Sequence, residues 1–227
     1  MILVERVVEP ASLTANKTKW LDDYLLAIKN YQANPIIKNK RLKLLAENKY
    51  RQQDVKTSLK NMFEGKCAYC ESHLAHISYG HIEHFKPKSS YPEDCFNWKN
   101  LLLGCEICNG AQYKSTHFPL EAENGPLVNP TVENPFVFFD FEYDPKTGLA
   151  NVLGKNDRGI TTERLLGLNR PDLIKHRSRI VRRIAYVAIK ASQGDNEALI
   201  EMRKLVEKEE EYSAFSISLS NKFGLVL

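Results

Sequence analysis

Residues 67–109 carry the most specific pattern in the chain, with the sequence CAYCESHLAHISYGHIEHFKPKSSYPEDCFNWKNLLLGCEICN. One Cys-x-x-Cys pair opens the stretch at Cys67 and Cys70, and a second closes it at Cys105 and Cys108. A two-residue gap lets one tight turn present two thiolates to a tetrahedral ion. Because four thiolates leave no open coordination position, the spacing predicts a structural zinc site.

The cysteine pattern has two alternatives to a site with four thiolates. A Cys-x-x-Cys pair also serves redox proteins, and His73 or His76 could replace one thiol as a zinc ligand. Cys95 is the fifth cysteine and has no partner in the pattern. We expect it to be a buried or partly buried free thiol with no assigned chemistry.

A second set of residues between the cysteine pairs suits hydrolysis at a divalent metal ion. Glu83 offers a hard oxygen ligand, and the adjacent His84 titrates near neutral pH as a general base. Asn100 can accept from one ring nitrogen of His84 and aim the other at a water molecule. Asn109 directly follows the last cysteine, so bound zinc would fix its backbone. Each residue alone is usually a surface or turn feature, so the spacing from the cysteines carries this interpretation.

The charge distribution favours a polyanionic partner. The chain has 227 residues, 43% of them hydrophobic and 26% charged, and a formal net charge of +4, as in ordinary globular proteins. Residues 36–60 contain eight Lys and Arg against two acidic residues, and residues 161–190 contain the same numbers. Such segments favour nucleic acid, although solvated helix faces give the same pattern. The acidic residues of 195–211 form either a docking face or a solvated helix.

The first residues have no basic region and no apolar core of the kind found in secretory signals. No run of about 18 apolar residues occurs, so no membrane span is expected. We therefore expect a cytoplasmic protein.

Hydrophobic periodicity predicts a mainly helical α+β chain. Helices are expected over about 15 residues ending at Asn34, over 37–64 with a break near Asn48, over two segments beginning near Thr161 and Pro171, and over about 195–212. A short helix is expected from Asn109 to about Lys114. Strands are expected at 2–8, at 82–85, and in a hairpin of 136–143 and 149–153. The segment after Phe215 is ambiguous between helix and strand.

Three regions are expected, packed as one compact unit. They are an N-terminal helical region (1–65), a zinc-containing core (66–125), and a hairpin with C-terminal helices (126–227).

A wider motif runs over most of residues 60–175. Its parts are CxxC at 67–70, IEHFxPK at 82–88, NWxNLLLxCxxCN at 97–109, FPL at 118–120, PLVNP at 126–130 and LLGLN at 165–169. With these parts the sequence resembles the HNH (ββα-metal) endonucleases. More narrowly, it is similar to the PtuB-type HNH subunits of Septu and retron anti-phage defence systems.

The resemblance implies a central zinc-bound ββα-metal core and a catalytic centre inside it. It implies His84 as general base and Asn100 as the residue that orients it. It also implies Glu83 and Asn109 as ligands of a catalytic Mg²⁺ or Mn²⁺, beside the structural Zn²⁺.

The chain departs from the common HNH pattern at Asn109, where many such enzymes have a histidine. This leaves His117 as a further candidate for the catalytic site. His81 either contacts the metal or the substrate, or has a structural role. Lys114 is expected either to neutralise the cleaved phosphate or to be a surface lysine.

The resemblance also implies a function and partners. The implied activity is an endonuclease, acting on DNA more than on RNA, that forms the effector subunit of a defence complex. The implied partners are a PtuA-like ATPase subunit and, in retron systems, a reverse transcriptase–msDNA complex. Two alternatives stay open: a non-catalytic zinc-ribbon module that binds nucleic acid, and a subunit whose helices mainly dock a partner.

Overall fold

The N-terminal part of the chain is helical. The computed structural model describes residues 1–74 and 80–227. It begins with α1 (Ala11–Ala33), α2 (Ile37–Glu47), the 3₁₀ turn η1 (Asn48–Tyr50) and α3 (Gln53–Met62). The predicted helices and the break near Asn48 are confirmed, except that α1 has 23 residues instead of about 15. The predicted strand at 2–8 is wrong, because this segment has no strand ladder and its Val4 amide donates instead to the Pro130 carbonyl at 2.8 Å.

Two short antiparallel strands form the centre of the molecule. β1 (His81–His84) pairs with β2 (Leu101–Gly104), with His84 opposite Leu101 and His81 opposite Gly104. All of β2 is buried, which explains its apolar run Leu-Leu-Leu. The Ala68 amide donates to the Leu103 carbonyl at 2.8 Å, so the first cysteine pair is attached directly to β2.

The segment after the second cysteine pair differs from the prediction. A short helix was expected from Asn109 to Lys114, but these residues form successive turns. Their hydrogen bonds include those from the Tyr113 amide to the Gly110 carbonyl at 3.0 Å and from the Lys114 amide to the Cys108 carbonyl at 3.2 Å. Gly110 makes the tight turn possible, since a Cβ there would lie 2.9 Å from the Glu106 carbonyl oxygen.

A second hairpin follows, as predicted. β3 (Phe139–Asp144) pairs with β4 (Leu149–Gly154) in antiparallel register. The Asp144 carboxylate accepts from the Lys146 amide at 2.9 Å and from the Thr147 hydroxyl at 2.7 Å. These bonds close the turn, and Gly148 ends it at a φ of +71°.

Four helices complete the chain: α4 (Asp157–Leu165), α5 (Pro171–Ser192), α6 (Asn196–Leu205) and α7 (Ser213–Lys222). α4 begins earlier than predicted, because the Asn156 side chain caps it by accepting from the Gly159 amide at 3.0 Å. α5 begins at Pro171 as expected. α6 ends short of residue 212, and the ambiguous segment after Phe215 is helical.

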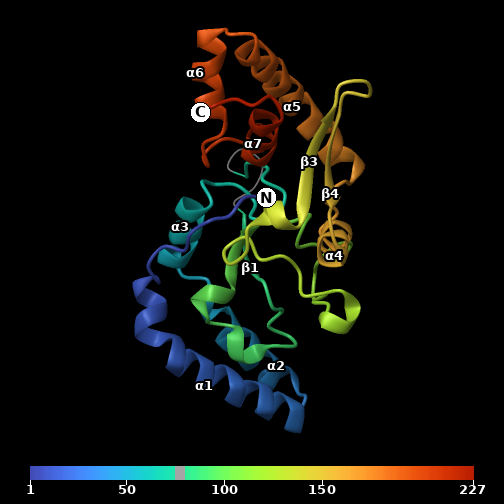
Figure 1. Cartoon of the computed structure of the whole chain (residues 1–227). Helices are drawn as coiled ribbons and strands as arrows, with labels where there is room; N and C mark the ends of the chain where they lie inside the picture. Colours follow the sequence, from blue (N-terminus) through green and yellow to red (C-terminus); the bar gives the residue numbers. More distant parts are fainter. Residues whose placement is uncertain (75–79) are drawn as a thin grey trace.

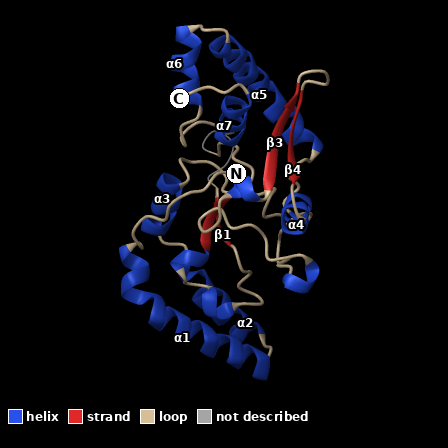
Figure 2. Ribbon diagram, viewed as in Figure 1, coloured by secondary structure: helices blue, strands red, loops and turns tan. Residues whose placement is uncertain are grey.

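The elements form an elongated arrangement around β1 (Figures 1 and 2). α1 and α2 lie at one end, α5 to α7 lie at the other, and β3 and β4 run beside α5. Buried residues from all three predicted regions belong to one hydrophobic cluster. Short 3₁₀ turns occur at η2 (Pro92–Asp94), η3 (Trp98–Asn100), η4 (Glu121–Glu123) and η5 (Pro135–Val137). Within the described ranges no helix has the length and apolarity needed to cross a membrane.

Candidate metal centre and catalytic cavity

The four predicted zinc ligands converge. The sulfur atoms of Cys67, Cys70, Cys105 and Cys108 all lie within 4.8 Å of one another. The Cys105 amide donates to the Cys67 sulfur at 3.3 Å, and the Cys108 amide donates to the Cys105 sulfur at 3.2 Å. Backbone donors aimed at sulfur favour thiolates, which are the form that binds zinc. The cluster therefore fits a structural Zn²⁺, as predicted.

The pKa values of the four thiols shift in opposite directions: those of Cys70 and Cys105 are lowered, and those of Cys67 and Cys108 are raised. Hydrogen bonds from Cys105, Cys108 and Cys67 lower the pKa of Cys70, whereas burial raises the pKa of Cys67. Outside the cluster, the Arg170 guanidinium donates to the Cys108 sulfur at 3.4 Å. Burial alone would lower the pKa of Arg170, but the thiolates outweigh it and raise that pKa. Arg170 therefore offsets part of the negative charge of a zinc–tetrathiolate group.

His73 and His76 were the two alternative zinc ligands at this centre. Among the described residues, the metal-binding group consists of the four cysteines alone. His73 is held through its backbone amide, which donates to Glu211 at 3.0 Å. His76 lies outside the described residues.

Three of the four predicted hydrolytic residues line a separate cavity of about 380 Å³, and Asn100 is not part of its described lining. β1 supplies Glu83 and His84 to this cavity, and the turn after the second cysteine pair supplies Asn109. Glu83 and His84 are buried, with 3% and 6% of their surfaces exposed, while His81 is exposed at the same cavity. The described lining does not include His117, whose ring contacts the Lys114 carbonyl at 3.2 Å.

Gly104 explains how Glu83 and Asn109 come close together. It lies on β2 between them, and a Cβ built there would be 3.1 Å from Glu83 Cβ and 3.9 Å from Asn109 Cβ. The absence of a side chain at Gly104 thus lets Glu83 and Asn109 both lie close against the same point of β2. Oxygen ligands of this kind are those that Mg²⁺ and Mn²⁺ prefer.

His84 is fixed in one orientation. Its Nε2 lies 2.9 Å from the Cys95 carbonyl oxygen, and the Tyr50 ring packs edge-on against it with centroids 4.6 Å apart. Because a carbonyl can only accept, Nε2 must carry the proton and Nδ1 is left with a free lone pair. Burial lowers the pKa of His84 to about 3, against the opposing effect of the Cys95 carbonyl. The imidazole is therefore neutral at pH 7, but its pKa lies well below the near-neutral value expected from the sequence, so in this structure His84 is a weaker base than expected.

Asn100 does not contact His84 as expected. Its amide oxygen accepts from the Lys86 amide at 2.7 Å, and its amide nitrogen donates to the carbonyls of Lys86 and Asp94 at 3.0 and 3.1 Å. The predicted direct bond is wrong because these backbone groups occupy the Asn100 side chain. Asn100 instead fastens the loop that ends beside Cys95, whose carbonyl orients His84.

Lys114 occupies a place that neither prediction anticipated. It is fully buried, forms an ion pair with the Glu83 carboxylate, and donates to the His84 carbonyl at 2.8 Å. It is neither a surface lysine nor exposed to a substrate phosphate. Its own amide donates to the Cys108 carbonyl at 3.2 Å, so it joins the thiol cluster to β1. Burial raises the pKa of Glu83, and the Lys114 charge opposes that rise.

Several cavity residues were missed in the sequence. Tyr50 and Arg51 come from the N-terminal helical part, far from the motif, and no sequence signal marks them. Lys88 does belong to the motif at 82–88, and its ammonium lies 3.2 Å from Glu47 and 5.5 Å from the Tyr50 ring centroid. Burial alone would lower the pKa of Lys88, but Tyr50 and Glu47 outweigh it and raise that pKa. Arg51 and Lys88 place positive charge at this cavity, and Glu47, which also lines it, offsets part of that charge.

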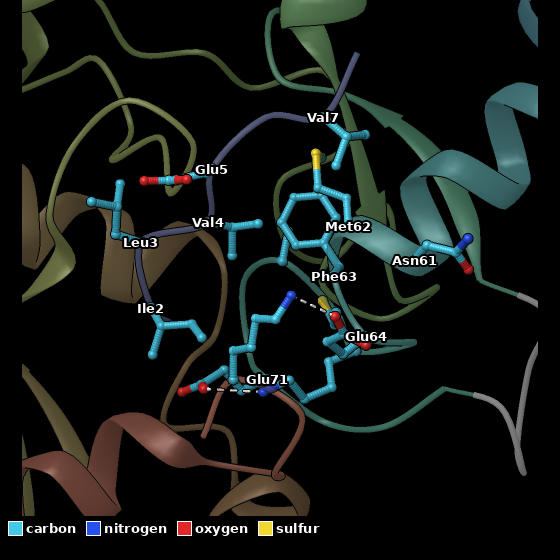
Figure 3. A pocket seen from close by; sticks show the side chains of 14 residues that line it. Ile2, Leu3, Val4, Glu5, Val7, Asn61, Met62, Phe63, Glu64 and Glu71 are labelled. Carbon is cyan, nitrogen blue, oxygen red and sulfur yellow. Dashed lines mark ion pairs between the residues drawn. The ribbon is translucent and has the colours of Figure 1, made fainter. Parts of the chain in front are cut away.

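A second hollow of about 520 Å³ lies beside the first cysteine pair (Figure 3). Apolar side chains such as Val4 and Met62 line it. The charges at this hollow are largely paired: Lys66 with Glu71 at 3.7 Å and Lys208 with Glu64 at 2.8 Å, drawn as dashed lines in Figure 3. This hollow contains none of the candidate catalytic side chains, which line the smaller cavity instead.

A four-thiol cluster that supports a two-stranded hairpin carrying Glu-His is the arrangement of an HNH-type protein. In this chain the hairpin and the cluster are present, while turns take the place of the helix that would complete a ββα unit.

Comparison with curated proteins gives the particular relatives. The chain is 28% identical to a Septu protein PtuB of Bacillus mycoides over 223 residues, which covers 86% of this chain and 72% of the relative. It is 40% identical to a Septu protein PtuB of Bacillus thuringiensis over 120 residues, covering 52% of this chain and 42% of the relative. It is 28% identical over 141 residues to a Vibrio cholerae protein named "Retron Vc95 putative HNH endonuclease", covering 59% of this chain and 65% of that protein.

These relatives confirm the resemblance predicted from the motif: the chain is similar to Septu PtuB proteins and to a retron protein named as an HNH endonuclease. The aligned part spans less than two thirds of the B. thuringiensis and V. cholerae relatives. No protein-family model matches the chain, and no solved structure matches it.

Proposed function

We propose that the chain is a metal-dependent endonuclease that hydrolyses phosphodiester bonds in nucleic acid. The observation that carries this proposal is the His84 ring, whose Nε2 faces the Cys95 carbonyl in a cavity shared with Glu83 and Asn109. This orientation leaves Nδ1 unprotonated. An immobilised imidazole with an unprotonated nitrogen meets the geometric requirement of a general base for water, whereas burial keeps its pKa below the value that is best for this role.

Glu83 and Asn109 would hold the catalytic Mg²⁺ or Mn²⁺. Their oxygen donors fit these hard cations, and Gly104 lets them approach each other. The ion, when bound, stabilises negative charge on the phosphate oxygens and the leaving oxygen. His84 takes the proton from the attacking water, while Arg51 and Lys88 attract the anionic substrate. Asn100 acts indirectly, because it holds the loop whose Cys95 carbonyl orients His84.

The proposed biological role is the effector subunit of an anti-phage defence complex in the cytoplasm. Its support is the similarity to Septu PtuB proteins and to a retron protein named as an HNH endonuclease. The proposed partners are a PtuA-like ATPase subunit and, in a retron system, a reverse transcriptase–msDNA complex. DNA is the proposed substrate ahead of RNA.

The test compares wild type with His84→Ala on supercoiled plasmid, single-stranded DNA and RNA, with Mg²⁺ or Mn²⁺ and with or without a PtuA-like ATPase. Wild type should cleave, and His84→Ala should lose at least about 100-fold in rate, in line with removal of a general base. Zinc content and circular dichroism should stay those of wild type. His117→Ala is the matched control, because this histidine lies outside the described cavity lining and should cleave normally. Cleavage by His84→Ala at the wild-type rate would reject the mechanism.

One observation favours an alternative, non-catalytic zinc-ribbon module that binds nucleic acid. The Lys114 ammonium already neutralises the Glu83 carboxylate, which weakens the attraction of that carboxylate for a cation. The alternative predicts binding that does not depend on Mg²⁺ and no turnover with any partner or substrate. The same assay therefore separates the two functions.

A further inference from the structure

The structure divides the basic residues of 161–190 into two groups. Three of them serve the fold or are paired: Arg170 contacts the Cys108 sulfur, Arg177 is fully buried, and Arg183 pairs with Glu201 at 3.1 Å. Arg177 in particular donates to the carbonyls of Ala150 and Leu168 at 2.6 to 3.0 Å. Arg170 and Arg177 are therefore not available to a ligand, whereas Arg183 stays exposed beside its partner.

Three other cations of α5 share one exposed face. Lys175, Arg179 and Arg182 follow one another at spacings of four and three residues, which places them in a row on a helix. All three are exposed, and none forms an ion pair within the described part of the chain. Along the helix axis the row covers about 10 Å, equal to roughly three nucleotides of one duplex strand.

These cations line a groove between α5 and the β3–β4 turn, with a volume of about 570 Å³. α5 and the hairpin lie side by side (Figure 1), joined by the bond from the Ala150 amide to the Ser178 hydroxyl at 2.9 Å. Gly148 in the turn makes room for Arg182, since a Cβ there would lie 2.8 Å from the Arg182 guanidinium. The turn therefore forms one wall of the groove, with the Arg182 guanidinium close to Gly148.

The same face of α5 continues with an aromatic residue. Tyr186 lies four residues after Arg182 and is 62% exposed, and the Lys190 ammonium lies 5.9 Å from its ring centroid. An exposed aromatic ring next to a row of cations can stack on a base while the cations contact phosphates. An acidic protein surface would pair with the cations but has no need of the exposed ring.

We propose that this groove, lined by Lys175, Arg179 and Arg182, binds the phosphodiester backbone of a nucleic-acid strand at a site separate from the cleavage cavity. The identity of the ligand rests on the proposed nuclease function, because the bound strand is the substrate. The groove would hold the strand while the cavity around His84 cuts it, and so would set the affinity for long substrates without taking part in the chemistry.

The test measures binding of fluorescein-labelled 30-nucleotide DNA, single-stranded and duplex, to full-length zinc-loaded protein by fluorescence anisotropy. The His84→Ala background prevents cleavage. Adding Arg179→Ala and Arg182→Ala should weaken binding about tenfold near 100 mM salt, and the slope of log affinity against log salt should fall by between about one and two. Arg203→Ala with Lys204→Ala is the matched control, since it removes two exposed cations of α6, and it should bind like the background protein.

Catalysis at the cleavage site is measured separately, as the rate of hydrolysis of bis(p-nitrophenyl) phosphate. This diester is too small to occupy the cavity and the groove at the same time. With His84 restored, the Arg179/Arg182 variant should hydrolyse this diester at the wild-type rate. Unchanged DNA affinity, or an equal loss in the α6 control, overturns the proposal. Normal DNA binding together with weakened binding to an acidic partner protein also overturns it and assigns the groove to that partner. If no form hydrolyses the diester, the proposed nuclease function fails while the binding result still decides the groove.

Discussion

The thiol cluster and the catalytic cavity lie against the same pair of strands but are built differently. The cluster takes its four ligands from two tight turns, Cys67–Cys70 and Cys105–Cys108. The cavity combines β1 with the turn after the second pair and with the N-terminal helical part. A centre made from local turns can be found by spacing in a sequence. A cavity made from distant segments depends on how the whole chain packs.

The largest expected effect comes from removing one zinc ligand. Cys67→Ser should lower zinc content from about one ion per chain to near zero, because Cys67 also accepts the Cys105 amide that orders the second pair. Structural zinc contributes many kcal/mol in small domains. We expect the melting temperature to fall by more than about 10 °C. The readouts are elemental analysis and thermal unfolding.

Cys95→Ser is the matched control for that change. Cys95 is buried but lies outside the cluster, and burial raises the pKa of its thiol to about 12. Zinc content should stay at the wild-type level in this variant. Loss of zinc in Cys95→Ser, or full zinc content in Cys67→Ser, would show that the cluster has been assigned wrongly.

The next largest effect tests Lys114, which connects the thiol cluster to the strand that carries Glu83 and His84. Lys114→Met leaves the buried Glu83 carboxylate without its ion-pair partner, and breaking such a pair costs about 3–5 kcal/mol. The cleavage rate should fall together with the stability, because the Glu83 carboxylate and the His84 carbonyl both lose the ammonium group that holds them. Zinc should remain bound, since the Lys114 side chain does not contact the cluster. Chemical denaturation and zinc analysis are the measurements.

A double variant makes this test specific. Lys114→Met combined with Glu83→Gln removes both charges, so most of the lost stability should return while cleavage stays absent. If the loss of unfolding free energy in the double variant equals the sum of the losses in the two single variants, Lys114 does not act through Glu83.

The sequence predicted the parts of the site that depend on local spacing. The cysteine cluster, the strand carrying Glu83 and His84, and the hairpin at 139–154 were all predictable from spacing and alternation. Contacts between distant segments could not be predicted in this way. The carboxamide of Asn100 meets backbone groups of its own loop, so His84 is oriented by the Cys95 carbonyl, a group that every residue possesses.

Burial accounts for the other differences. A lysine in a polar turn is ordinarily a surface residue, and only the packed structure shows Lys114 with no exposed surface beside Glu83. The helix expected after Asn109 failed because Gly110 supports a tight turn at that point. The edge-on contact of Tyr50 with His84 joins residues 34 positions apart, with no motif to connect them.

Acidification should reveal the burial of His84. Its pKa is lowered from 6.5 to about 3 in the folded chain, so between these values the unfolded chain binds the extra proton. The stabilisation is complete above pH 6.5 and is lost as the pH falls towards 3. Between pH 7 and pH 5 the loss is about 2 kcal/mol.

His84→Gln supplies the reference for this effect, because glutamine does not titrate. The difference in unfolding free energy between wild type and His84→Gln should shrink by that amount over this pH range. Protonation of the zinc thiolates affects both proteins equally and cancels in the difference. A difference that grows on acidification would mean that His84 is protonated in the folded chain.

The smallest expected effect separates the two centres most sharply. In Gly104→Ala the new Cβ would lie 3.1 Å from Glu83 Cβ, so Glu83 must shift by a few tenths of an ångström. We expect a stability loss of about 1 kcal/mol and cleavage reduced about tenfold, because small displacements of catalytic groups are costly. The thiol cluster depends on the turns flanking β2 rather than on Gly104, so zinc content should not change. Equal losses of zinc and cleavage would instead show that the two centres move as one unit, and unchanged cleavage in a folded variant would remove Glu83 from the proposed metal site.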